Sequence, residues 1–113
     1  MSSRDELIDK YADDIQEKCG ETPDRELLGK VVVGLGPSVY NADASVVAAS
    51  DPDEVENIKK KFLIKKLGLS DGPDLDAALD KVFDQYGRSN RHKYRAVVYY
   101  LLTRHFGRES VYA

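Results

Sequence analysis

Apolar side chains surround most of a helix over residues 90–107, which read N-R-H-K-Y-R-A-V-V-Y-Y-L-L-T-R-H-F-G. At about 100° per residue, one face collects Tyr94, Val97, Val98, Leu101 and His105. Other apolar or aromatic residues cover most of the remaining circumference: Ala96, Tyr99, Tyr100, Leu102 and Phe106. A helix of this kind is stable only when other segments cover it, so it predicts the central, C-terminal helix of an all-α domain.

Prolines and glycines divide the rest of the chain. Proline at the first helical position loses no hydrogen bond, and four prolines stand where a helix can begin: Pro23, Pro37, Pro52 and Pro73. Glycine is favoured where a helix ends in a left-handed residue, and five stand at such places: Gly20, Gly34, Gly68, Gly87 and Gly107. With apolar stripes at helical spacing, these residues predict helices at 4–19, 23–35, 52–67 and 73–86.

Local patterns refine this division. Ser3 and Glu6 form a capping box ahead of the first helix. The run Val31-Val32-Val33 is short and continues the helical spacing from Leu27, which favours a helix over a strand. Residues 36–50 predict only one or two short helical turns, with three anchoring side chains: Tyr40, Val46 and Val47.

Length and composition indicate one globular domain over residues 1–113, since 42% of the 113 residues are hydrophobic and 33% are charged. No run approaches the roughly 18 apolar residues of a membrane helix, so we expect no membrane partner. The start M-S-S-R-D-E-L lacks the apolar core of a secretory signal. Cys19 is the single cysteine, which fits a reducing cytoplasm and predicts a buried hydrophobe rather than a nucleophile.

Charge is distributed unevenly along the chain. Residues 1–57 hold 5 Lys or Arg against 14 Asp or Glu, whereas residues 58–113 hold 12 against 6. The two halves are therefore complementary. This pattern favours acidic and basic helices that face each other within the fold or across a homodimer, and the alternative is a dedicated basic binding face.

A cationic cluster precedes the apolar segment and comprises Arg88, Arg91, Lys93 and Arg95. Basic residues interleaved with aromatic ones can bind phosphates and stack on bases. Cations are unfavourable at the N-terminus of a helix, so either acidic side chains of the first half or an external anion must compensate them. The size of the acidic half favours internal compensation.

Catalytic and metal-binding patterns are missing from the sequence. It has no G-x-S-x-G, no phosphate loop and no H-E-x-x-H. Asn41, Asp43 and Ser45 alternate as in a calcium loop, but Val46 and Pro52 stand where that loop needs Gly and Glu. We expect no catalytic residue, metal site or cofactor. The polar residues of the apolar segment are predicted to be structural members of the core: Tyr94, Tyr99, Tyr100 and His105.

Three long motifs carry a resemblance to a known family: G-P-S-V-Y-N-A-D-A-S, F-L-I-K-K-L-G-L-S-D-G-P and the segment 90–107. Over nearly its whole length the chain resembles the bacterial family called domain of unknown function 2853. The resemblance implies a compact all-helical fold in a cytoplasmic bacterial protein. It implies no activity, so no functional residue is transferred.

The sequence thus predicts an all-α bundle of five main helices with short extra turns. The leading functional hypothesis is a non-enzymatic interaction or regulatory module that binds a protein partner, either another protein or a second copy of the chain. The second is a nucleic-acid or anion-binding protein that uses the basic C-terminal half. An enzyme is the third.

Overall fold

The computed structural model describes residues 4–41, 45–89 and 93–112. Its main helices are α1 (Arg4–Glu17), α2 (Arg25–Leu35), α3 (Pro52–Asn57), α4 (Pro73–Tyr86) and α5 (Arg95–His105). Short helices add η1 (Gly36–Tyr40), η2 (Ile58–Ile64) and η3 (Glu109–Tyr112). Within the described ranges, extended pairing is limited to one bridge between Val46 and Tyr94. The prediction of an all-α bundle with five main helices is confirmed.

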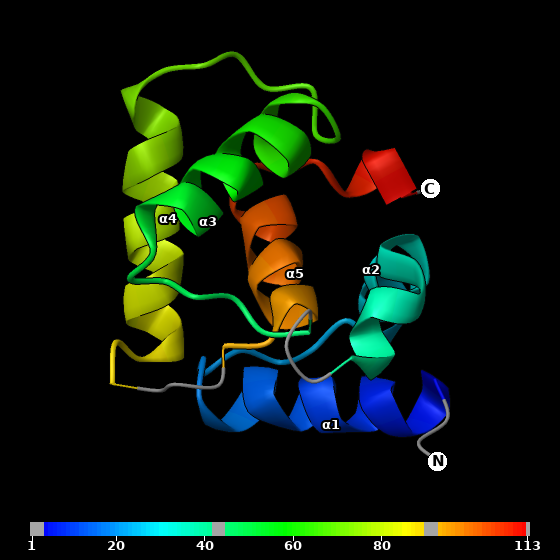
Figure 1. The fold of residues 1–113 in the computed structure, drawn as a ribbon. Helices are drawn as coiled ribbons and strands as arrows, with labels where there is room; N and C mark the ends of the chain where they lie inside the picture. Colours follow the sequence, from blue (N-terminus) through cyan, green and yellow to red (C-terminus); the bar gives the residue numbers. More distant parts are fainter. Residues whose placement is uncertain (1–3, 42–44, 90–92, 113) are drawn as a thin grey trace.

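Helix α5 occupies the centre of the bundle (Figure 1). It packs between α2 and α4 and also contacts α1. Seven of its 11 residues are buried: Ala96, Val97, Val98, Tyr100, Leu101, Leu102 and Thr103. The predicted central position is confirmed, because a helix with apolar residues on nearly every side requires neighbours on nearly every side.

The N-terminus of α2 differs from the prediction by two residues. Asp24, rather than Pro23, precedes the first turn, and its side chain accepts a 3.2 Å hydrogen bond from the Leu27 N–H. A carboxylate that satisfies the third free N–H of a helix fixes where that helix begins. At the other end, Gly36 rather than Gly34 has the left-handed conformation, with φ of 68°.

The first helix ends at Glu17, earlier than the predicted residue 19. Gly20 has a φ of 70°, and the Glu21 N–H returns to the Ile15 carbonyl at 3.2 Å. This turn closes the helix before Cys19, which is nevertheless buried as predicted. The proposed cap Ser3 lies outside the described residues.

The central helix begins at Arg95 rather than near residue 90. Residues 93–95 pair with residues 45–47 through two 2.7 Å hydrogen bonds, from Val47 N–H to the Lys93 carbonyl and from Arg95 N–H to the Ser45 carbonyl. This pairing keeps Tyr94 extended, with ψ of 134°, so the helix cannot start before it.

The predicted helix at 52–67 is α-helical only to Asn57 and continues as the π-helical η2. A hydrogen bond of the i→i−5 type, which defines a π-helix, joins the Leu67 N–H to the Phe62 carbonyl at 2.9 Å. Both residues are buried, and so are Ile58 and Leu63, which are also five positions apart. The wider turn therefore brings into one core the apolar residues that an α-helix would distribute over two faces.

Residues 36–50 contain the short 3-10 helix η1, in agreement with the prediction of short helical turns. Val47 is buried and Val46 is half-buried. Tyr40 was predicted to be an anchor, but its exposed fraction is 56%. That prediction was wrong because the preceding Val39 takes the buried position in η1 and directs the next side chain outward.

Helix α4 has the predicted bounds, 73–86, and buries the whole predicted stripe. Pro73 stands in its first turn, and Gly87, with φ of 107°, follows its last residue. Across the described part of the chain, no helix is both long enough and apolar enough to cross a membrane.

Candidate functional site

Arg88 of the cationic cluster is exposed just beyond the end of α4. Its guanidinium pairs with Asp84, and with Asp80 at 3.2 Å. The hydrogen bonds to Asp84 and Asp80 raise the pKa of Arg88. Both acids belong to α4, so the charge of Arg88 is compensated from the preceding helix rather than from the acidic half.

Lys93 points inward, with an exposed fraction of only 4%. Its Nζ donates to the Arg88 carbonyl at 3.3 Å. Burial, together with the nearby Arg88 charge, lowers the pKa of the Lys93 ammonium. Lys93 is therefore not part of an exposed basic surface, and Arg91 lies outside the described residues.

Arg95 is held inside the fold by the first half of the chain. Its guanidinium pairs with Glu54, and both side chains are mostly buried, with 19% and 22% exposed. It also donates to the Val46 carbonyl and to the Tyr99 hydroxyl, each at 3.3 Å. This is the internal compensation expected from the acidic half. The described cations of the cluster therefore make separate local contacts. Arg88 pairs with α4, Lys93 donates to a backbone carbonyl, and Arg95 pairs with Glu54.

The three tyrosines predicted for the core take separate structural positions. Tyr100 is fully buried, and its hydroxyl accepts a 2.8 Å hydrogen bond from the Asp24 N–H. Tyr99 is half-buried and stacks on Phe62 with ring centroids 3.9 Å apart. Tyr94 is half-buried beside Tyr11, with a centroid separation of 5.1 Å. Their contacts are those of packing residues rather than of a shared catalytic site.

His105 was predicted to be a buried polar residue, and that prediction was wrong. The side chain is exposed because His105 ends α5, where the helix leaves the core. The polar residue buried in this turn is Thr103, whose hydroxyl donates to the Tyr99 carbonyl at 2.7 Å. The His105 ring lies against Phe106, at a centroid distance of 4.9 Å in a T-shaped arrangement.

A partly buried polar cluster joins α1, α4 and the start of α5. The Tyr86 hydroxyl donates to Asp14 at 2.6 Å and accepts from the Tyr94 N–H at 3.3 Å. Burial raises the pKa of nearby Cys19 to about 12, so its thiol stays protonated and is a poor nucleophile. Over the described ranges, no three His, Cys, Asp or Glu side chains gather as a metal site would require.

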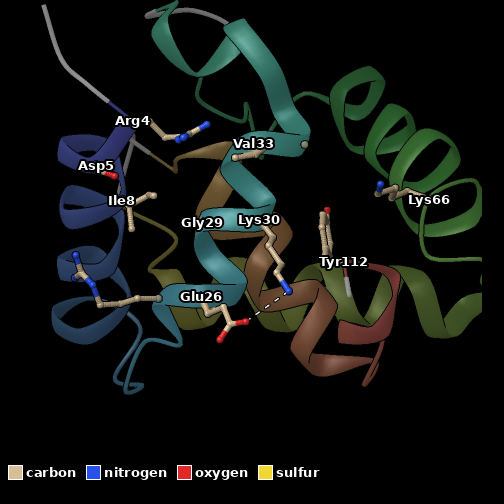
Figure 2. A pocket seen from close by; sticks show the side chains of 11 residues that line it. Arg4, Asp5, Ile8, Glu26, Gly29, Lys30, Val33, Lys66 and Tyr112 are labelled. Carbon is tan, nitrogen blue, oxygen red and sulfur yellow. Dashed lines mark ion pairs between the residues drawn. The ribbon is translucent and has the colours of Figure 1, made fainter.

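A hollow with a volume of about 570 Å³ crosses α2 (Figure 2). We call it the α2 groove. Its lining comprises Arg4, Asp5 and Ile8 of α1, six residues of α2, and Lys66 and Tyr112. The six residues of α2 are Arg25, Glu26, Gly29, Lys30, Val33 and Gly34.

Two glycines form the floor of the α2 groove. A Cβ atom at Gly29 would meet Ile8 Cδ1 at 3.5 Å, and one at Gly34 would meet Tyr112 Cε1 at 3.4 Å. Both separations are ordinary van der Waals contacts, so Ile8 and Tyr112 lie beside the backbone of α2 at these two positions. The resulting surface is low and partly apolar along the helix.

Val33 and Tyr40 are the large hydrophobic residues that the described chain leaves exposed, each at 56%. Val33 lines the α2 groove and also a smaller hollow, of about 160 Å³, that includes Tyr40. Arg4 lines both hollows as well, so the two adjoin. The apolar surface therefore continues from Tyr112 past Val33 to Tyr40.

Sequence reasoning missed this surface, although a signal for it exists. The inward stripe of α2 is already filled by Leu27, Leu28, Val31, Val32 and Leu35. Val33 follows Val31 by about 200° and must lie on the opposite face of the helix. An apolar residue left over once the inner face is complete is expected to be exposed to solvent.

The cations around the groove differ in their contacts. Arg25 pairs with Asp9, and Lys30 pairs with Glu26 at 3.6 Å. Lys66 places its Nζ 5.0 Å from the centre of the Tyr112 ring. This cation–π contact holds the ammonium at the edge of the groove while leaving its charge unneutralised.

Comparison with known families assigns the chain to a family. The family model described as "Protein of unknown function (DUF2853)" matches residues 10–110. The chain belongs to the DUF2853 family. The family predicted from the three motifs is thus confirmed, and no curated protein matches the sequence. The DUF2853 match includes the six groove residues of α2 and Lys66, whereas Arg4, Asp5, Ile8 and Tyr112 lie outside it.

Proposed function

We propose that this protein is a non-enzymatic module that binds a protein partner through the α2 groove. The observation that carries the proposal is the joint exposure of Val33 and Tyr40 on two adjoining hollows. A continuous apolar surface with a polar rim is typical of a protein interaction site, because water leaves it favourably when a partner covers it.

The alternative of a nucleic-acid or anion-binding protein has less support. The cluster predicted for that function is divided, since Arg88 pairs with α4, Lys93 is buried and Arg95 pairs with Glu54. Phosphate binding requires cations that can exchange their counterions for the ligand. These three side chains are committed within the fold instead.

A non-enzymatic role also agrees with the chemistry of the groove. Its tyrosine, Tyr112, has a pKa raised to about 12 by burial and by nearby Tyr99. A general acid or base works best with a pKa near the operating pH, so this hydroxyl is poorly suited to proton transfer. The groove is better suited to contact than to reaction.

The test compares partners captured from the native host by the intact protein and by groove variants. Val33→Gln combined with Tyr40→Ser removes the exposed apolar surface, and we expect recovery of the partner to fall at least about ten-fold. Ala77→Gln, on the exposed face of α4, is the matched control and should retain the partner. Thermal unfolding of all variants checks that they are folded.

The proposal fails if the double groove variant captures the same proteins in the same amounts as the intact chain. It also fails if Ala77→Gln loses them equally, since the loss would then not depend on the groove.

A further inference from the structure

We infer that the α2 groove recognises a partner segment in which an apolar residue is flanked on both sides by carboxylates. The inference rests on the proposed function and adds the chemistry of the partner. It follows from where the groove gathers positive charge, and from where Val33 lies between those charges.

The α2 groove is rich in basic residues, although the first half of the chain is mainly acidic. Residues 1–57 contain only five basic residues among 14 acidic ones, yet three of the five line the groove: Arg4, Arg25 and Lys30. Lys66 joins them from the second half of the chain. Four cations therefore face two lining acids, Asp5 and Glu26, in a region that is otherwise strongly acidic.

Two of these cations remain available to a ligand. Arg25 and Lys30 are engaged with Asp9 and Glu26. Arg4 has no acid within ion-pair distance anywhere in the described chain, and Asp5, its neighbour on α1, does not face it because adjacent helical residues diverge. Lys66 is held by an uncharged ring rather than by a carboxylate.

The positions of these two cations define the spacing of the ligand. Figure 2 shows Arg4 and Lys66 on opposite sides of Val33. A side chain that packs on Val33 is therefore bordered by positive charge in both directions. Carboxylates before and after an apolar residue would complement this arrangement.

The size of the apolar surface favours a short segment over a second copy of the chain. Stable dimers bury roughly 800 Å² on each partner, with a largely apolar centre. Within the described ranges, only Val33 and Tyr40 are large hydrophobic residues with high exposure. A groove with so few apolar anchors is typical of recognition of a peptide segment. Asp5 and Glu26 in the lining also disfavour a polyphosphate chain.

The experiment selects phage-displayed random peptides of about 12 residues on the full chain and measures synthetic versions by fluorescence polarisation. We expect enriched peptides with Asp or Glu on both sides of an apolar residue. Their affinity should fall at least about ten-fold with Arg4→Gln plus Lys66→Gln, and weaken as salt rises. Lys61→Gln, an exposed lysine of η2 outside the groove, is the matched control and should change affinity by less than about two-fold.

Each other outcome overturns the inference. Peptides that need Val33 but have neutral or basic flanks, or that bind the Arg4 and Lys66 variant equally well, would leave the proposed function intact and remove the charge requirement. If no selected peptide loses affinity on Val33→Gln, the inference and the groove both fail. A doubled mass in light scattering that Val33→Gln abolishes would identify a second copy as the occupant instead.

Discussion

The hydroxyl of Tyr100, buried in the centre of α5, accepts a 2.8 Å hydrogen bond from the Asp24 N–H at the start of α2. Tyr100→Phe should keep the packing of the ring but leave that N–H without its acceptor. We expect the free energy of unfolding to fall by about 1 to 2 kcal/mol, measured by urea denaturation. Tyr40→Phe removes an exposed hydroxyl and should change it by less than about 0.5 kcal/mol. Equal effects of the two substitutions would contradict the role of this hydrogen bond.

Leu101 has 2% of its surface exposed and lies on the central helix. Leu101→Ala should lower the free energy of unfolding by about 2 to 5 kcal/mol, because it removes buried methyl groups and leaves a cavity. The same denaturation experiment on Val33→Ala, at an exposed position, should show less than about 1 kcal/mol. A loss below about 1 kcal/mol for Leu101→Ala would be incompatible with the central position of α5.

The Arg95–Glu54 pair links the start of α5 to α3 across the two halves of the chain. A double-mutant cycle with Arg95→Gln and Glu54→Gln should give a coupling energy of at least about 1 kcal/mol, since both side chains are largely shielded from water. The exposed Lys30–Glu26 pair on α2 serves as the control, and its coupling should stay below about 0.5 kcal/mol. Similar coupling energies in the two pairs would mean that burial does not strengthen the Arg95–Glu54 pair.

Alkaline pH should destabilise the fold. The pKa values of Cys19 and Tyr11 are raised to about 12, mainly by burial, from ordinary values of 9.0 and 10.0. Above about pH 9 the unfolded chain releases protons that the folded chain retains, so stability present at neutral pH is lost as pH rises. At pH values where such a group is ionised in the unfolded chain but not in the folded one, it lowers the free energy of unfolding by about 1.4 kcal/mol per pH unit.

Urea unfolding at about pH 8 and about pH 11 should therefore differ by at least about 2 kcal/mol. Tyr11→Phe keeps the ring beside Tyr94 but removes one ionisable group, so its stability should depend less steeply on pH. Unchanged stability over this range would show that these groups titrate alike in the folded and unfolded states.

The predictions that succeeded depend on local sequence. Helix α4 has a proline at its start, a glycine after its end and one uninterrupted apolar stripe, and all three act within a few residues. The all-α class and the central α5 follow equally from periodicity and from the circumference that α5 must cover.

The predictions that failed depend on contacts between distant residues. The start of α5 is set by residues 45–47, which lie about fifty positions earlier in the chain. His105 shares a helical face with Leu101, but periodicity does not show where along its length a helix emerges from the core. The α2 groove arises only when α1, α2 and η3 come together, so composition and motifs could not define it.

The π-helical η2 makes the position of Lys66 tolerant of a one-residue change in chain length. A π turn contains about one residue more than an α turn, so a single-residue deletion between residues 58 and 64 should restore a regular α-helix. Because the wider turn already absorbs the additional residue, the side chains after the deletion should keep their faces, and the ammonium of Lys66 should stay beside the Tyr112 ring. The same deletion within the regular helix α4 would instead rotate every later residue of that helix by about 100° about its axis.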